Sequence, residues 1–373
     1  MSNTLGKAIT VTLFGESHGA SVGCVLDGVA AGVKMDEGFM AQQMDKRRAK
    51  GTISTARQEA DAVHIQSGVV NGVCTGTPIC LLIENTNTKS ADYAKTQTLL
   101  RPGHADYTAH VKYKGFEDAR GGGHFSGRLT APLVAAGSIF THLLAGKGVC
   151  IATHMAECAG VKDNTFAQDA KTMAQQMAAL NAQDFAVLDA EKGLAMQQLI
   201  EMAAKDGDSV GGILETVITG LPVGLGEPFF GSVESELAKA LFSIPAVKGV
   251  EFGLGFAFAD KKGSTANDAF TVQAEKISTK TNHNGGINGG ITNGMPIVLR
   301  TVVKPTPSIY KPQSTVDIAA MQNATLQLAG RHDPCIVHRA RVVQDSLCAL
   351  VLADLATQMY GTAWQEETPW ITG

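Results

Sequence analysis

The sequence carries an approximate internal repeat, and this repeat limits what the chain can fold into more than any other feature. Residues 21–27 read SVGCVLD and residues 209–215 read SVGGILE, and each copy precedes a glycine-containing turn and an amphipathic helical pattern. Val70-Asn71-Gly72 and Ile287-Asn288-Gly289 begin a second pair of similar segments in the same order. Chance similarity of short glycine-rich strings is the alternative. Because no low-complexity linker separates the copies, we expect one domain with two similar halves around a shared core.

The halves are predicted to span about residues 5–150 and 205–355 of a single domain, residues 1–373. A helical insertion rich in alanine and glutamine is predicted around residues 160–208. Hydrophobic periodicity distinguishes strands from helices. It predicts strands at residues 9–13, 22–26, 73–83, 210–218 and 297–303, and helices at residues 36–48, 129–144, 166–180, 189–204 and 345–359.

Charge and cysteine content exclude several classes of protein. The formal net charge is −4, so no general positive field would attract nucleic acid. The seven cysteines form no C-x-x-C pair, and His332, Asp333, Cys335 and His338 fit no standard metal spacing. The sequence shows no signal-peptide pattern and no uninterrupted apolar stretch of membrane-spanning length. We therefore expect a cytoplasmic protein with reduced thiols, no metal, and no membrane or nucleic-acid partner.

The ten arginines are distributed unevenly. None occurs between Leu129 and Leu299, although lysines do. Nine fall in three groups, which are Arg47, Arg48 and Arg57; Arg101, Arg120 and Arg128; and Arg331, Arg339 and Arg341. Guanidinium groups bind carboxylates and phosphates with a planar fork, whereas lysine offers a point charge. The distribution indicates an anion-binding pocket, with chance composition as the alternative.

Residues 14–19, FGESHG, contain the G-x-S-x-G pattern of a hydrolase nucleophile elbow. Ser17 would then be the nucleophile, and His332 or His338 would be its base. However, a hydrolase serine of this type follows several strands, and only one predicted strand precedes Ser17. The alternative is that His18 is the working residue and Ser17 its neighbour.

Two further segments place polar side chains in loops. Residues 120–128, RGGGHFSGR, form a glycine-rich turn before a predicted helix. Such a turn suits a phosphate or a phosphorylated cofactor, although a turn with a purely structural role would have the same sequence pattern. His104 lies in residues 101–108, RPGHADYT, and a loop histidine is a good candidate for proton transfer.

Taken together, these segments resemble the chorismate synthase family. FGESHG, RPGHADYT, the RGGG turn, GLGEPFF, SIPAVKGVEFG, HNGGINGGITNG, KPTPS and GRHDPC occur in that family's order, from Leu5 to Leu355. The resemblance implies an α+β fold in which helices lie between two antiparallel sheets, and it implies a homotetramer. The implied enzyme is a carbon–oxygen lyase acting on phosphate in the last step of the shikimate pathway, which leads to the aromatic amino acids.

The implied reaction converts 5-enolpyruvylshikimate-3-phosphate to chorismate by an anti 1,4-elimination of phosphate and a ring proton. It requires reduced FMN without net redox change, because the flavin lends electron density to the breaking C–O bond and recovers it. An external flavin reductant and an association with NADP are implied as well. A substrate with a phosphate and two carboxylates would account for the arginine groups.

The resemblance also implies roles for individual residues. His18 matches the histidine that protonates the departing phosphate, with Ser17 in support, and His104 matches the histidine beside the flavin. Asp333 matches the aspartate that helps proton removal, and Ser126 matches an active-site serine. The implied substrate ligands are His18, Arg47, Arg101, Arg128 and Arg331. The implied flavin-binding residues are His124, Phe125, Ser126, Pro245, Ala246, Gly289, Lys304, Pro305, Thr306, Pro307, Ser308 and Arg331.

Two stretches depart from the family pattern. Many members read Arg-Ser-Ser-Ala-Arg-Glu-Thr after the three glycines, whereas this chain reads HFSGRLT from His124. The loop after Arg48 is short, and Lys50 is a candidate substitute for an arginine. The rival classes are a serine hydrolase, a nucleotide-binding transferase that uses the glycine turn, and a flavin-binding protein without activity.

Overall fold

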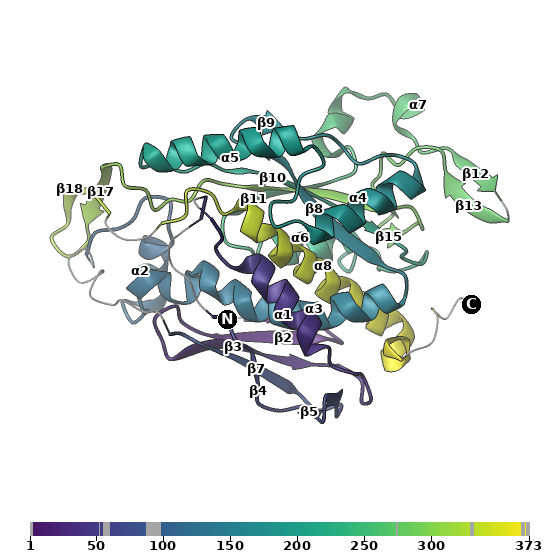
Figure 1. Cartoon of the computed structure of the whole chain (residues 1–373), viewed down its shortest axis with the longest axis horizontal. Helices are drawn as coiled ribbons and strands as arrows, with labels where there is room; N and C mark the ends of the chain where they lie inside the picture. Colours follow the sequence, from purple (N-terminus) through teal and green to yellow (C-terminus); the bar gives the residue numbers. More distant parts are fainter. Residues whose placement is uncertain are drawn as a thin grey trace.

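Two five-stranded antiparallel sheets enclose a layer of helices, as Figure 1 shows for the computed structural model. The structure describes residues 3–51, 53–54, 60–86, 98–273, 275–328, 332–366 and 370. Two further helices cover the outer face of the second sheet (Figure 1). This architecture is the α+β sandwich that the sequence resemblance implies.

The first sheet has the strand order β1-β2-β3-β7-β4. Alternate side chains of its central strands are buried against the helices, including Val22, Leu26 and Leu81. The register of β2 and β3 pairs Gly15 with Val22, so residues 16–20 form a hairpin turn at the sheet's end. The strands are β1 (Thr4–Leu5), β2 (Thr10–Gly15), β3 (Ser21–Asp27), β4 (His64–Ile65) and β7 (Ile79–Glu84), with a short hairpin of β5 (Val69–Val70) and β6 (Val73–Cys74).

The second sheet has the strand order β11-β16-β10-β8-β9, and its neighbouring strands are all antiparallel. Its strands are β8 (Cys150–Cys158), β9 (Val161–Lys162), β10 (Gly212–Thr219), β11 (Val247–Phe252) and β16 (Ile297–Val303). Three separate two-stranded hairpins follow later in the sequence. They are β12 (Phe270–Gln273) with β13 (Lys276–Thr279), β14 (Ile287–Asn288) with β15 (Ile291–Thr292), and β17 (Gln313–Asp317) with β18 (Gln322–Leu326).

The helical layer contains α1 (Glu37–Arg47), α3 (Thr130–Gly146), α6 (Val233–Leu241) and α8 (Val337–Tyr360). Within the described residues, the segments Arg120–Gly146 and Val337–Gln365 are long and apolar enough to cross a membrane, but both are mostly buried inside the protein. They are therefore the core helices of this fold. The remaining short helices are α2 (Asp106–Tyr113), η2 (Arg120–Phe125), η3 (Gly127–Leu129), η4 (Gly255–Asp260), α7 (Gly263–Ala266) and η5 (Gly361–Gln365).

The predicted insertion forms β9, α4 (Ala170–Ala182) and α5 (Ala190–Lys205), and a buried histidine attaches it to the sheet. His154 on β8 contacts Asp163 Oδ2 through Nδ1 at 2.7 Å and Glu215 Oε1 through Nε2 at 3.3 Å. Asp163 also accepts the backbone N–H groups of Leu188 and Asp189. Burial lowers the pKa of His154, but the two carboxylates outweigh it and raise the pKa above its ordinary value.

Most elements predicted from periodicity are present, with shifted ends. Asp36 caps α1 as expected by accepting the Phe39 N–H at 2.8 Å, and β16 matches residues 297–303. The predicted helix at 345–359 begins eight residues too late. Because α8 is buried on nearly all sides, it has no amphipathic stripe to mark its start. The predicted strand at 73–83 is wrong, because the structure divides it into β6 and β7. The predictions omitted several elements, among them β8, β11, α2 and α6.

Candidate active site

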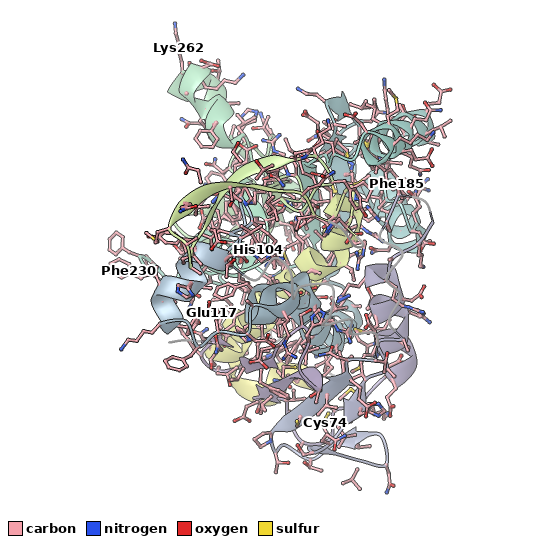
Figure 2. The ribbon with its side chains drawn as sticks, turned by 90° about the vertical axis from the view of Figure 1, so that its left-hand side faces the viewer. Cys74, His104, Glu117, Phe185, Phe230 and Lys262 are labelled. Carbon is pink, nitrogen blue, oxygen red and sulfur yellow. The ribbon has the colours of Figure 1, made fainter. Side chains whose placement is uncertain are left out.

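The C-terminal end of α1 and the N-terminal ends of α3 and α8 meet at two adjoining cavities. The smaller has a volume of about 300 Å³ and the larger about 810 Å³. His104, Ser126 and Asp333 line both cavities, so these three side chains lie where the cavities meet. Figure 2 views this side of the molecule, with His104 near the centre.

Five arginines line the smaller cavity, and each of the three sequence groups contributes at least one. They are Arg47, Arg48, Arg101, Arg128 and Arg339. Against the two lining aspartates, these arginines leave three net positive charges when the histidines are neutral. The wall is therefore suited to an anion with several charges.

Two described arginines of these groups lie elsewhere. Arg120 pairs with Asp118 at 2.8 Å, and Arg341 is buried under the carbonyl groups of Leu180 and Gln183. Arg57 and Arg331 lie outside the described residues. The proposed contacts of Arg331 with substrate and flavin therefore stay predictions.

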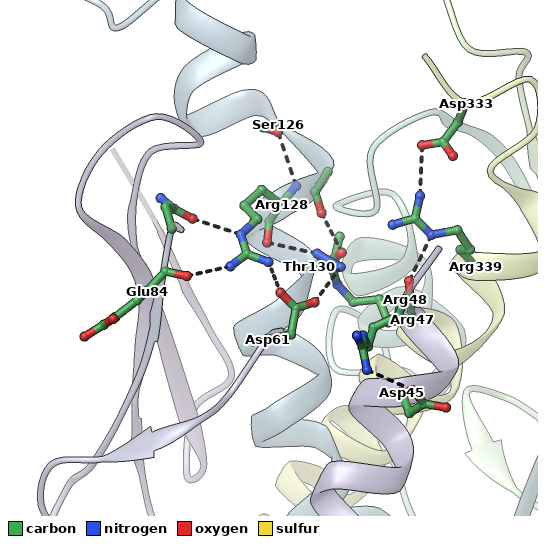
Figure 3. A network of polar contacts seen from close by, with 12 residues as sticks. Asp45, Arg47, Arg48, Asp61, Glu84, Ser126, Arg128, Thr130, Asp333 and Arg339 are labelled. Carbon is green, nitrogen blue, oxygen red and sulfur yellow. Dashed lines mark hydrogen bonds and ion pairs between the residues drawn. The ribbon is translucent and has the colours of Figure 1, made fainter. Parts of the chain in front are cut away.

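Asp61 lies between Arg47 and Arg128 (Figure 3). Its Oδ2 accepts from Arg47 Nη1 at 3.3 Å, and its Oδ1 accepts from Arg128 Nη1. All three side chains are at most 7% exposed. Burial lowers the pKa of Arg47 to about 10, against the effect of the Asp61 charge, so Arg47 stays charged at neutral pH.

Asp106, the first residue of α2, holds both Arg101 and His104. It accepts from Arg101 Nε at 2.8 Å and Nη2 at 2.6 Å, and its Oδ1 lies 2.9 Å from His104 Nδ1. Burial raises the pKa of Asp106, but the hydrogen bonds from His104 and Arg101 outweigh it and hold the pKa well below its ordinary value. Because an ionised carboxylate only accepts, the shorter contact with Asp106 places a hydrogen on His104 Nδ1, beside which Arg101 Nη2 also lies at 3.2 Å.

Arg339 joins the Asp333 loop to α1. Its Nη1 donates to Asp333 Oδ2 at 2.8 Å, and its Nε donates to the Arg47 carbonyl at 2.9 Å (Figure 3). One guanidinium group on α8 therefore fixes both a predicted catalytic carboxylate and the end of the helix that carries Arg47.

Ser17 and His18 lie in the hairpin turn between β2 and β3, and not in a strand-to-helix elbow. Ser17 is fully buried, and its Oγ has no hydrogen-bond partner within the described residues. A hydrolase nucleophile requires a base within hydrogen-bond reach, which Ser17 lacks in this part of the chain. The described geometry therefore does not support Ser17 as a hydrolase nucleophile.

The glycine-rich turn packs directly against the two predicted catalytic histidines. Gly121, Gly122 and Gly123 all have positive φ angles, of 58°, 85° and 51°. A Cβ atom on Gly121 would lie 2.2 Å from His18 Cε1, and one on Gly122 would lie 3.0 Å from His104 Cε1. Gly121 itself lines the smaller cavity, whereas His18 lies directly behind it and is not one of the lining residues of either cavity. The phosphate-binding role expected of the turn stays a prediction.

The larger cavity fits a flavin. Its wall includes apolar side chains such as Val11, Leu13 and Leu133, together with polar groups of the KPTPS segment. Lys304 of that segment donates to the Gly103 carbonyl at 2.5 Å, which attaches the segment to the His104 loop. A flat, largely apolar ring with an anionic phosphate requires such a mixture of apolar wall and positive charge.

Most of the predicted flavin-binding residues line this cavity. They are His124, Phe125, Ser126, Pro245, Ala246, Lys304, Thr306, Pro307 and Ser308. Pro305 packs instead against Gly211, and Gly289 lies in the exposed turn of the β14–β15 hairpin. Neither of these two residues lines the larger cavity. Lys50 pairs with Asp45 and Asp184, away from the lining residues, so it does not replace a pocket arginine.

Sequence patterns did not identify Asp61 as a site residue or single out Arg339 within its group. Asp61 belongs to no motif, because its role depends on arginines that lie 14 and 67 residues away. Arg339 lies in the part of α8 that periodicity did not predict. The only available signal was its membership of the third arginine group.

The comparisons with known proteins agree with one another. The sequence matches the family described as "Chorismate synthase" over residues 9–357. It is 47% identical to the chorismate synthase of Dehalococcoides mccartyi over 95% of this chain and 97% of that protein. It is 45% identical to that of Pyrococcus abyssi, over 94% and 96%. The fold is similar to a crystal structure of chorismate synthase, with a TM-score of 0.76, 26% identity, and coverage of 97% of this chain and 95% of that chain.

Proposed function

The chain belongs to the chorismate synthase family, and we propose that its two adjoining cavities hold the substrate and the flavin of the family's reaction. It is a carbon–oxygen lyase that acts on phosphate and converts 5-enolpyruvylshikimate-3-phosphate to chorismate. The observation that carries the proposal is the meeting of the arginine-lined cavity and the apolar cavity at His104, Ser126 and Asp333.

The smaller cavity is the proposed substrate site. The substrate has a phosphate and two carboxylates, and Arg47, Arg101 and Arg128 offer guanidinium forks from three different segments. These forks are held in place by the buried Asp61 and the partly buried Asp106, so little reorganisation is needed when the anion binds. The same groups stabilise the negative charge that collects on the departing phosphate.

His18 and His104 are the proposed proton-handling groups. His18 lies directly behind Gly121, which lines the substrate cavity, and it is the proposed donor of a proton to the departing phosphate. His104 is held by Asp106 through Nδ1, which leaves Nε2 to hold or exchange a proton. Asp333, held by Arg339, is the proposed carboxylate for removal of the ring proton.

The larger cavity is the proposed site of reduced FMN, which supplies electron density to the breaking C–O bond. Lys304, Thr306 and Ser308 would bind its polar parts, and Val11, Leu13 and Leu133 would contact its ring. His124 and Phe125 replace the polar pair found in many members at this wall. His124 Nδ1 lies 2.8 Å from the Gly15 carbonyl, so that nitrogen is already engaged with the protein.

We also propose that the protein is a cytoplasmic homotetramer supplied with reduced flavin by an external reductant. Large apolar side chains on the surface support an oligomer, because a tetramer would cover them. Phe229, Phe230 and Phe256 are among the most exposed, and Phe230 projects from the body in Figure 2. Light scattering coupled to size-exclusion chromatography measures the oligomeric state.

We further propose that the two sheets are copies of one duplicated unit. The order β2, β3, α1, the β5–β6 hairpin, β7 and α3 matches the order β8, β10, α6, the β14–β15 hairpin, β16 and α8. In both sheets the second strand of the unit lies between the first and the last. This correspondence supports the halves and the insertion expected from the sequence.

The test of the site is an anaerobic assay of chorismate formation with chemically reduced FMN. Activity with reduced FMN and none with oxidised FMN is the expected result. Arg128→Lys should weaken substrate binding, whereas Arg300→Lys, whose arginine pairs with Glu251 outside both cavities, should not. Reduced FMN should also bind more tightly when substrate is present, since the two cavities share a wall. Equal FMN affinity with and without substrate would contradict the adjoining sites.

A further inference from the structure

Asp61 is shared by the two most deeply buried arginines of the smaller cavity. The side chains of Arg47 and Arg128 are less exposed than those of Arg48, Arg101 and Arg339. Two guanidinium groups in such a position repel each other, and burial strengthens that repulsion. The Asp61 carboxylate places one negative charge between them and accepts a hydrogen bond from each (Figure 3).

The two arginines depend on Asp61 to different degrees. Arg128 is also held by Asn85 Oδ1 at 2.9 Å from its Nε and by the Glu84 carbonyl at 3.0 Å from its Nη2. Within the part of the chain that the structure describes, Arg47 has one other hydrogen bond, a 3.5 Å contact from Nη2 to the Arg128 carbonyl. Its Nε is buried and has no hydrogen-bond partner within the described residues. Asp61 is therefore the main group that orients Arg47.

We propose that Asp61 is a positioning residue for substrate binding, because it turns the fork of Arg47 toward the cavity beside that of Arg128. This inference rests on the proposed role of both arginines as substrate ligands. Asp61 itself is a carboxylate in the wall of the cavity and would repel an anionic substrate. A carboxylate in an anion-binding site is explained if correct orientation of the two guanidinium forks strengthens substrate binding more than removal of its negative charge would.

Orientation and charge predict opposite results when the carboxylate is neutralised. If Asp61 only reduced the charge of the pocket, Asp61→Asn would tighten substrate binding. If Asp61 positions the arginines, Asp61→Asn turns an amide N–H₂ group toward one guanidinium and loses that fork, so binding weakens. Asp61 has a φ of 51°, which asparagine also tolerates, so this substitution adds little backbone strain.

The experiment measures the substrate dissociation constant by calorimetry with oxidised FMN, which does not support turnover. Loss of a charge-assisted hydrogen bond predicts roughly 10- to 100-fold weaker binding for Asp61→Asn. The affinity for FMN alone should be unchanged. Asp268→Asn is the matched control, because Asp268 is a buried carboxylate that is hydrogen-bonded to Thr281 and Asn284 outside both cavities. Unchanged or tighter substrate binding by a folded Asp61→Asn protein would overturn the inference.

Chemical rescue gives a second readout that a general loss of stability would not produce. Asp61→Gly keeps the positive φ without strain and opens a space beside the cavity for a small carboxylate. Added formate should then strengthen substrate binding by Asp61→Gly, whereas it should only compete with substrate in the unsubstituted protein. Absence of rescue would also count against positioning. If Arg47→Lys leaves substrate affinity unchanged, the substrate-site assignment fails; if only the Asp61 variants are neutral, the positioning role alone fails.

Discussion

Gly121→Ala should slow the chemical step strongly, although it adds a single methyl group. The new Cβ atom would lie 2.2 Å from His18 Cε1, 2.3 Å from His18 Nδ1 and 3.0 Å from Ser17 Oγ. His18 is 8% exposed and lies in a hairpin turn between two paired strands, so its ring must move from its position behind Gly121 to accept the methyl group. The substitution therefore displaces the proposed proton donor but leaves the imidazole group itself unchanged.

The displacement can be worked out from the same contacts. Ordinary van der Waals contact with a Cβ atom begins at 3.4 Å, so the His18 ring must retreat by about 1.2 Å. A misplacement of about 1 Å can cost roughly 10²-fold in rate. A positioned general acid contributes about 10²- to 10⁴-fold in all. We therefore expect kcat to fall by about 10²- to 10³-fold, with a smaller change in substrate affinity.

The assay is single-turnover rapid mixing of enzyme, substrate and reduced FMN under anaerobic conditions. Gly148→Ala controls for backbone strain, because Gly148 also has a positive φ, of 80°, but a Cβ atom there would meet nothing within 4 Å. Both variants should lose about 1 kcal/mol of folding free energy through the left-handed conformation. Only Gly121→Ala should release phosphate more slowly. A folded Gly121→Ala enzyme with the turnover of the Gly148→Ala control would refute the role of His18, packed behind Gly121, as the proton donor.

Three further results are expected. Arg339→Lys cannot donate to both Asp333 and the Arg47 carbonyl, so kcat/KM should fall at least about tenfold; unchanged steady-state parameters would show that this ion pair is not needed. Ser17→Ala should reduce activity much less than His18→Ala, since the buried hydroxyl forms no covalent bond to substrate; an inactive Ser17→Ala beside an active His18→Ala would contradict the mechanism. The pKa of His154 is raised above 6.5 in the folded protein, so its contribution to the free energy of unfolding is complete below pH 6.5 and is lost as pH rises through the folded-state pKa. Urea midpoints measured from pH 6 to 9 should therefore decline more in the unsubstituted protein than in His154→Asn, and equal slopes would disprove the linkage.

The residues within contiguous motifs could be located from the sequence because each motif carries its own geometry. The RPGHADYT segment places His104 and Asp106 close together, and His104 lies in the expected loop, although the helix that begins at Asp106 was not predicted. The RGGG segment was expected to form a glycine-rich turn before a helix, and that turn is present. What approaches it could not be predicted, because His18 and His104 come from other segments.

The residues that were missed act through partners distant in sequence. The role of Asp61 depends on its contacts with Arg47 and Arg128, and no local sequence pattern indicates that these three residues are neighbours. Burial likewise removed the signal for secondary structure. On β8, Thr153 and His154 are fully buried polar residues within the sheet, so the strand lacks the alternation of apolar and polar residues that periodicity detects.

The pairing of α3 with α8 has a consequence for the way this protein is made in a cell. The ribosome completes the apolar helix α3 early, but α8, which packs beside it in the helical layer, is almost the last element to emerge. Roughly 200 residues separate them, which corresponds to on the order of 10–40 s at synthesis rates of about 5–20 residues per second. During that time the nascent chain exposes a segment apolar enough to enter a lipid bilayer or to aggregate. Chains truncated before α8 should therefore bind chaperones or precipitate, and slower, cooler expression should raise the soluble yield of the full-length protein.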